Sequence, residues 1–121
     1  MRLSRVIAAL VGLFLVALGL WSFLGPRSFY DQLATFPPYN RHLFHDIGAF
    51  QVGLGAVLLL AVRWGDALGV ALTGVGIGAA LHAAAHWWDR DLGGKSSDPY
   101  LLSVLALVIL AAALARARAR D

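Results

Sequence analysis

The sequence predicts an all-α fold, an integral membrane four-helix bundle whose helices run up and down in antiparallel order. Hydrophobic residues make up 60% of the 121 residues and charged residues only 14%, whereas soluble domains are close to half apolar and a quarter charged. The apolar residues fall into four long runs joined by short polar segments, and short connections place consecutive helices antiparallel. Helices are expected because lipid offers no partners for unpaired backbone groups. A single domain over 1–121 accounts for the chain.

The first helix is expected over about 5–24. Its apolar run over 6–24 is close to the ~20 residues that a helix needs to cross the hydrocarbon layer, and Gly25-Pro26 ends it. The basic start resembles a signal peptide, but the run is long for one and lacks a small-x-small cleavage site. We therefore expect this helix to be retained. Residues 26–39 mix aromatic and polar side chains, which suits either a short interfacial helix or an exposed loop.

The other three helices are expected over about 41–62, 67–88 and 99–117. Asn40 is a suitable N-cap for the first of these three, because its side-chain oxygen can accept from the first free N–H groups. Ser97 or Asp98 is expected to cap the last helix, and Pro99 suits its first helical position.

The basic residues predict how the bundle is oriented. If the N-terminus is inside, six of them lie on the inner side and four on the outer side, and cytoplasmic segments carry the excess of arginine and lysine. Both termini are therefore expected in the cytoplasm. The same residues flank apolar runs instead of forming a basic face with interleaved aromatics, so no nucleic-acid binding is expected. The inner six are Arg2, Arg5, Arg63, Arg116, Arg118 and Arg120, and the outer four are Arg27, Arg41, Arg90 and Lys95.

All four histidines fall at one end of the predicted bundle. His42 and His45 lie where the second helix begins, and His82 and His86 lie where the third helix ends. Each of these helices also carries a stripe of small residues, and the Gly-x-x-x-Gly spacing on the third lets a neighbouring backbone approach. If the stripes face each other, the histidines converge near the outer leaflet. The stripes are His45, Ala49, Gly53 and Ala56, and Val70, Gly74, Gly78, His82 and His86.

Convergent imidazoles with a carboxylate would suit several kinds of site. Zinc or copper could be bound by imidazoles, and iron by imidazoles with a carboxylate. A haem could instead be held by one imidazole from each helix, with His45, His82 and His86 as the candidates. A proton relay or quinone site is a third option. The predicted metal ligands are His42, His45, Asp46, His82 and His86.

Two simpler interpretations stand beside these sites. Histidine is tolerated at headgroup depth, where water reaches it, and His42 lies four residues before Asp46 and could simply pair with it.

The chain has no cysteine, which removes thiol catalysis, cysteine-ligated zinc and iron–sulfur clusters. It also has no phosphate loop, dinucleotide fingerprint or nucleophile elbow. The sequence thus leaves enzyme activity open.

Two segments give the chain a family resemblance. Residues 40–48 (NRHLFHDIG) resemble the polar, Asp-Gly-containing start of the second helix in small DoxX-like four-helix membrane proteins, and residues 82–89 (HAAAHWWD) are similar to histidine-bearing helix ends in bacterial members of that group. The resemblance implies a multi-pass protein of a bacterial inner (plasma) membrane. One branch of the group is linked to quinone-coupled sulfur oxidation as a subunit of a larger enzyme. No catalytic residue carries over, because no site motif matches position by position.

Two functional hypotheses follow from the sequence. In the first, the outward-facing His/Asp cluster binds a metal or haem for redox chemistry or metal handling. In the second, the chain is a non-catalytic accessory subunit that packs against a larger, quinone-linked membrane complex, which its small size and glycine-rich faces favour. The expected partners are the lipid bilayer and either such a complex or further copies of the chain.

Overall fold

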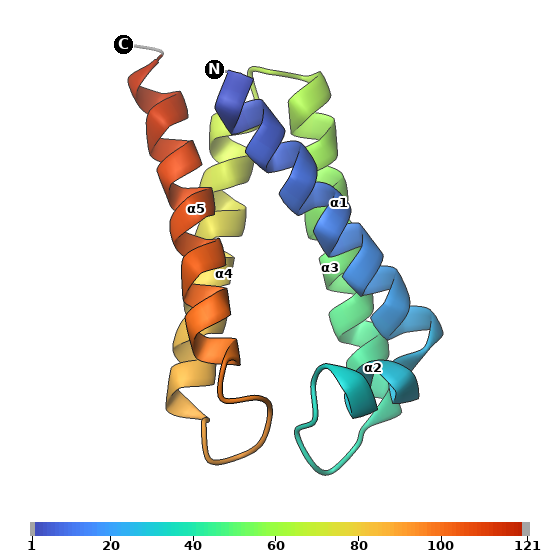
Figure 1. The fold of residues 1–121 in the computed structure, drawn as a ribbon. Helices are drawn as coiled ribbons and strands as arrows, with labels where there is room; N and C mark the ends of the chain where they lie inside the picture. The colour runs from blue at the N-terminus through green and yellow to red at the C-terminus, as the bar shows by residue number, and fades with distance from the viewer. Residues whose placement is uncertain (1, 120–121) are drawn as a thin grey trace.

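The computed structural model describes residues 2–119 and contains five helices in that range (Figure 1). No strand occurs between residues 2 and 119. Four of the helices are long and apolar enough to cross a membrane, so the chain has the character of a small multi-pass membrane protein. The fifth is a short helix within residues 26–39, the segment for which the sequence allowed either a short helix or a loop. The helices are α1 (Arg2–Leu24), α2 (Pro26–Gln32), α3 (Arg41–Arg63), α4 (Leu68–Trp88) and α5 (Asp98–Arg118).

The helix ends follow local chemistry. Asn40 caps α3 as predicted, because its side-chain oxygen accepts from the Leu43 N–H at 3.2 Å. The predicted cap of α5 differs. Ser97 occupies the N-cap position without a side-chain hydrogen bond, and the Asp98 carboxylate instead accepts from the Lys95 N–H at 2.8 Å. That hydrogen bond stabilises the loop before the helix.

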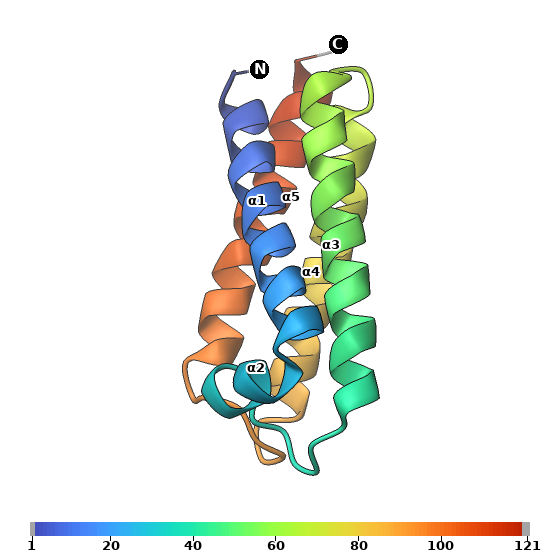
Figure 2. The same cartoon turned by 90° about the vertical axis from the view of Figure 1, so that its right-hand side faces the viewer.

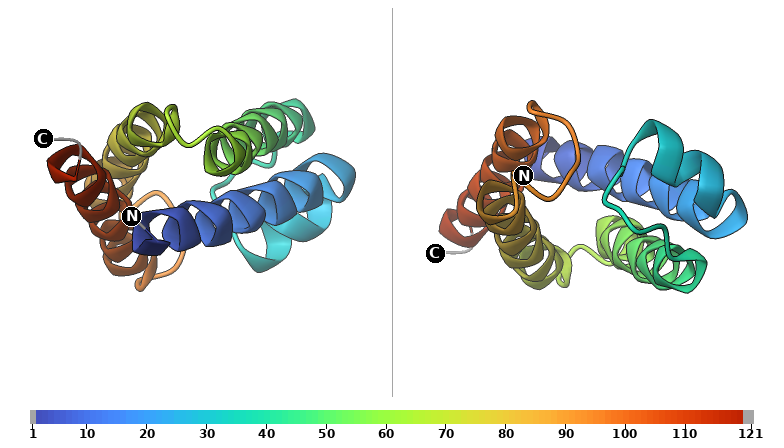
Figure 3. Two further views of the ribbon diagram at one scale, coloured as in Figure 1. Left: turned by 90° about the horizontal axis from the view of Figure 1, so that it is seen from above. Right: turned by 90° about the horizontal axis from the view of Figure 1, so that it is seen from below.

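The long helices form two pairs, α1 with α3 and α4 with α5 (Figures 1 and 2). The start of α1 and the end of α5 lie at one end of the molecule, which we call the terminal end, and α2 lies at the other, which we call the α2 end (Figure 1). The two pairs meet at the terminal end and diverge toward the α2 end. Views along the long axis show α1 and α3 leaning away from α4 and α5 (Figure 3).

Glycines bring the backbones of α1 and α3 into contact. A Cβ on Gly48 would lie 2.6 Å from the Gly19 carbonyl oxygen, and a Cβ on Gly55 would lie 2.6 Å from the Gly12 carbonyl oxygen. The two helices therefore run in opposite directions, and a spacing of seven residues on each repeats the contact after about two turns. In lipid, where burying apolar surface gives little driving force, such close contacts are what hold helices together.

The terminal end contains the main core, in which residues of all four long helices pack together. Two hydrogen bonds add specific links there. The Ser4 hydroxyl on α1 donates to the Ala112 carbonyl on α5 at 3.1 Å, and the Arg116 guanidinium donates to the Gly65 carbonyl in the α3–α4 turn at 2.9 Å. The largest fully buried side chains of this core are Leu58, Leu68, Leu72 and Ile109.

At the α2 end, the two pairs are joined through their loops. The Gly94 N–H in the α4–α5 loop donates to the Thr35 carbonyl in the α2–α3 loop at 2.9 Å. The Phe36 ring lies against the same glycine, where a Cβ would come within 2.7 Å of it. We call this contact of Thr35 and Phe36 with Gly93 and Gly94 the loop clasp. Both glycines have positive φ values, 147° and 76°, which side-chain-bearing residues rarely adopt.

Replacing Gly48 with alanine is expected to destabilise the fold. The new Cβ would meet backbone atoms, Gly19 O at 2.6 Å and Phe23 N at 2.8 Å, so α1 and α3 would have to separate, and overpacking of this kind costs about 1–3 kcal/mol. Gly53→Ala is the matched control, because nothing lies within 4 Å of a Cβ there. Thermal unfolding of both variants in detergent, followed by circular dichroism, measures the difference. Equal melting temperatures would contradict the glycine contact.

Candidate functional site

The four histidines lie near the α2 end, but on two different helix pairs. His42 and His45 are in the first two turns of α3, and His82 and His86 are in the last two turns of α4. Because α3 belongs with α1 and α4 belongs with α5, these two sets are carried by the parts of the molecule that diverge (Figure 1).

The predicted contact between the small-residue stripes of α3 and α4 is wrong. Gly53, Gly74 and Gly78 each have open space where a Cβ would be, with no atom within 4 Å. The physical reason is that α3 uses a different set of small residues, Gly48 and Gly55, against α1. An apolar groove of about 360 Å³ lies between α3 and α4 instead. It is lined on α3 by Leu54, Val57 and Trp64 and on α4 by Val70 and Gly74, among others.

His82 and His86 form a hydrogen-bonded pair on α4. Their Nε2 atoms are 3.1 Å apart and their ring centroids 4.8 Å apart, so one ring donates and the other accepts through an unprotonated nitrogen. The spacing of four residues places both rings on one face of the helix. Phe36 from the loop clasp meets the His86 ring edge-on, with centroids 5.4 Å apart.

The histidines of α3 have other partners. His42 Nε2 lies 3.5 Å from Asp46 Oδ2, and these side chains are 85% and 54% exposed, so this is the simple pair that the sequence allowed. Such an exposed contact between an imidazole and a carboxylate contributes little to stability. The His45 ring packs against Phe23 on α1, with centroids 5.2 Å apart.

The predicted cluster of five metal ligands does not form in the described part of the chain. Across residues 2–119, no group of three or more His, Asp or Glu side chains comes together that could hold a metal ion. His42, His45 and Asp46 are thus not brought to the His82–His86 pair, and the haem arrangement with His45 opposite that pair is not seen either. The divergence of the two helix pairs separates the residues that the stripes were expected to bring together.

A pocket of about 720 Å³, which we call the polar pocket, is lined in part by His86, and sequence reasoning missed it. It is formed by the end of α4, the loop 89–97 and the start of α5. The available signal was the run Gly93-Gly94-Lys95-Ser96-Ser97, in which two glycines precede a cation and two hydroxyls. The charged and polar lining residues are His86, Arg90, Asp91, Lys95, Ser96, Ser97 and Tyr100.

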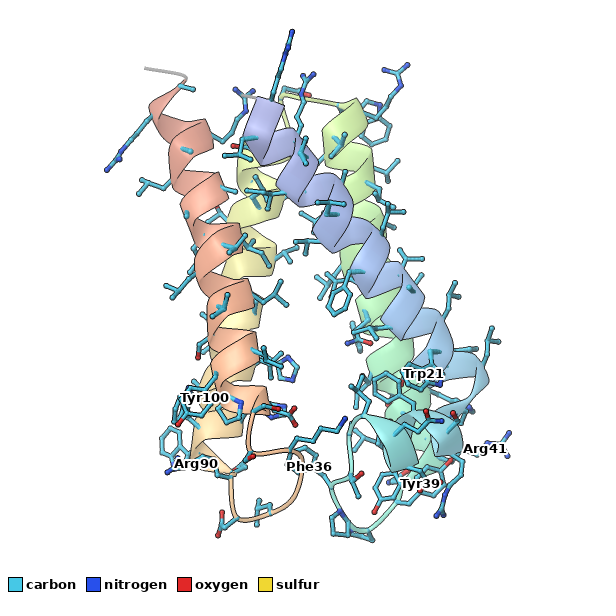
Figure 4. All side chains as sticks on the ribbon, viewed as in Figure 1. Trp21, Phe36, Tyr39, Arg41, Arg90 and Tyr100 are labelled. Carbon is cyan, nitrogen blue, oxygen red and sulfur yellow. The ribbon has the colours of Figure 1, made fainter. Side chains whose placement is uncertain are left out.

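Several aromatic side chains lie at the α2 end, with two arginines among them (Figure 4). Trp21, Tyr39 and Arg41 lie with the α1–α3 pair, Arg90 and Tyr100 lie with the α4–α5 pair, and Phe36 lies between the two groups. Tryptophan and tyrosine are enriched at the boundary between membrane and water. These side chains are therefore of the kind that suits headgroup depth at the α2 end.

Ring and charge contacts hold these side chains in place. The Arg27 guanidinium lies over the Tyr39 ring, 5.3 Å from its centroid, and its Nε donates to the Asp31 carboxylate at 2.9 Å. That hydrogen bond raises the pKa of Arg27 above its ordinary value. On the other pair, the Trp87 N–H donates to the Ser103 hydroxyl at 3.0 Å.

Comparison with protein-family models, curated proteins and solved structures finds no match for this chain. The site is therefore interpreted from its own geometry.

Opening the loop clasp is expected to move the helix pairs apart at the α2 end. Gly94→Ala places a Cβ 2.7 Å from the Phe36 ring on a backbone with φ of 76°, which alanine does not readily adopt. The chain has no cysteine, so spin labels attach only at introduced cysteines. A label pair at Gln32→Cys and Asp89→Cys reports this separation as a distance measured by double electron–electron resonance.

The distance distribution of this label pair should lengthen or broaden in the Gly94→Ala background. Labels at Arg63→Cys and Arg118→Cys, at the terminal end, should keep their distribution, because the main core there is untouched. An unchanged distribution at the α2 end would show that the clasp does not hold the pairs together.

Proposed function

We propose that this chain is a small multi-pass membrane protein that binds a transition-metal ion through His82 and His86. The observation that carries the proposal is the 3.1 Å separation of the two Nε2 atoms. At the metal–nitrogen distances of about 2.0–2.1 Å that zinc makes with imidazole, two nitrogens so spaced subtend roughly 95–100° at the ion. That angle lies between the octahedral and tetrahedral values. The ion would take the place of the shared hydrogen, and each ring would bind it through Nε2 as a neutral imidazole that carries its proton on Nδ1.

Two imidazole ligands favour zinc and copper over harder ions. They also leave coordination positions for water, unlike structural zinc sites, which are closed by four protein ligands. An ion held in this way exchanges readily, so we assign the pair to metal handling and not to a permanent structural site.

The metal site is expected to face the outside of the cell. Five basic residues of the described chain lie toward the terminal end, and Arg120 lies outside the described residues. Cytoplasmic segments carry the excess of basic residues, and the aromatic side chains gather at the opposite end (Figure 4). Both termini are then cytoplasmic, with the four long helices crossing the inner membrane up and down. The five basic residues are Arg2, Arg5, Arg63, Arg116 and Arg118.

Single cysteines in the cysteine-free chain test this orientation. Ser96→Cys lies in the loop at the α2 end and Asp66→Cys lies in the turn at the terminal end, and both native side chains are exposed. A membrane-impermeant maleimide applied to intact cells should label Ser96→Cys, whereas Asp66→Cys should react only after lysis. The reverse pattern would place the histidine pair in the cytoplasm.

Metal binding is tested on tag-free protein purified in mild detergent, by titration with Cu²⁺ and Zn²⁺ and metal analysis by plasma mass spectrometry. His82→Ala/His86→Ala should lower the affinity at least about tenfold, because even outer-shell partners of a metal contribute 10–100-fold. His42→Ala/His45→Ala is the matched control and should bind like the wild type. Equal affinity in the two double variants would refute a site at His82 and His86.

A second candidate function rests on the groove between α3 and α4. Gly74 lines this groove and has open space where a Cβ would be, and small residues are what allow a further helix to approach closely in a membrane. In this alternative, the chain is an accessory subunit of a larger membrane complex, the setting that the DoxX-like resemblance implies. It predicts that a partner co-purifies from native membrane, whereas a solitary monomer with bound metal would speak against it.

A further inference from the structure

The polar pocket beside His86 has a preformed wall. The loop 89–97 that builds most of it is held by three backbone N–H donors. Leu92 donates to the Asp89 carbonyl at 3.0 Å, Gly94 to the Thr35 carbonyl at 2.9 Å, and Lys95 to the Asp98 carboxylate at 2.8 Å. A ligand that enters the pocket therefore does not have to order this loop, which lowers the cost of binding.

The pocket carries cations that lack acidic partners. Arg90 and Lys95 both line it, and within residues 2–119 neither forms a salt bridge, unlike Arg27 with Asp31. The Arg90 guanidinium lies over the Trp87 ring, 5.2 Å from its centroid, a contact that positions the group without neutralising it. Asp91 is the acidic residue that lines the pocket. The nearby Asp98 carboxylate accepts a hydrogen bond from the Lys95 N–H.

The remaining lining groups can donate hydrogen bonds. Ser96 and Ser97 contribute hydroxyls and Tyr100 contributes a phenol, and the Ser97 side chain makes no capping bond to α5. Two cations and these neutral donors outweigh the one lining carboxylate, Asp91, and match a tetrahedral phosphate, which has several strong acceptor oxygens and one or two negative charges.

The surroundings of the pocket indicate where such a phosphate comes from. An exposed stripe continues along α5 from Tyr100 through Val104 to Leu107, at the spacing of one helix face. Tyr100 and the exposed Trp88 lie at the end of the molecule that suits headgroup depth. A phosphate in the pocket thus lies at the depth of lipid phosphates, with an apolar path for acyl chains below it.

We infer that this pocket binds the phosphate of a phospholipid headgroup through Arg90 and Lys95, with the lipid chains lying along Tyr100, Val104 and Leu107. The inference does not depend on metal binding, because neither cation belongs to the His82–His86 pair. It also makes the α4–α5 pair the part of the chain that selects its lipid neighbours.

Native mass spectrometry of the full chain in detergent tests this inference. The probes are phosphatidylglycerol, diacylglycerol with the same acyl chains, and inorganic phosphate. The wild type should retain phosphatidylglycerol about tenfold or more better than diacylglycerol, as expected for two charge-assisted hydrogen bonds. Arg90→Gln/Lys95→Gln should lose this preference. Arg27→Gln/Arg41→Gln, which removes the same charge from α2 and the start of α3, should keep the preference for phosphatidylglycerol.

A charge-preserving exchange separates a phosphate site from a folding defect. Arg90→Lys/Lys95→Arg should restore most of the preference, and circular dichroism should show the same helix content in all variants. Binding of inorganic phosphate without phosphatidylglycerol would overturn the lipid assignment. Equal retention of both lipids by the wild type, or equal losses in the two glutamine variants, would overturn the pocket as a phosphate site.

Discussion

The contact between the α1 and α3 backbones determines the architecture of this protein. Gly12 and Gly19 on one helix meet Gly55 and Gly48 on the other at distances that no side chain could share. Because α3 packs against α1 through Gly48 and Gly55, its other small residues, such as Gly53, are left in open space and do not pack against α4. The α4 helix pairs with α5 instead, and the two pairs are joined by the main core at the terminal end and by the loop clasp at the α2 end.

This arrangement places both proposed sites on the α4–α5 pair. His82 and His86 can share an ion because they lie one turn apart on one rigid helix, and no partner from α3 is needed to bring them together. The pocket beside His86 depends on Gly93 and Gly94, whose positive φ values fold the loop against Thr35 and Phe36. The same clasp thus shapes the pocket and contacts the His86 ring, so the two sites have a common structural support.

The four long helices and the Asn40 cap could be predicted from the sequence, since apolar run length and cap chemistry act locally. The choice of packing face could not, because α3 offers two sets of small residues and periodicity alone does not rank them. The matching seven-residue spacings of Gly12 and Gly19 and of Gly48 and Gly55 were the signal that would have ranked them. The convergence of the histidines failed for the same reason. The pocket was missed because its walls depend on a loop conformation.

The divergence of the helix pairs gives the molecule a wedge shape, wider at the α2 end than at the terminal end (Figure 1). In a bilayer, a wedge displaces more lipid area from one leaflet than from the other. Its insertion free energy then depends on curvature, and the protein is favoured where the leaflet at its α2 end is convex. Curved and flat regions of the same membrane would on this ground differ in how much of this protein they hold.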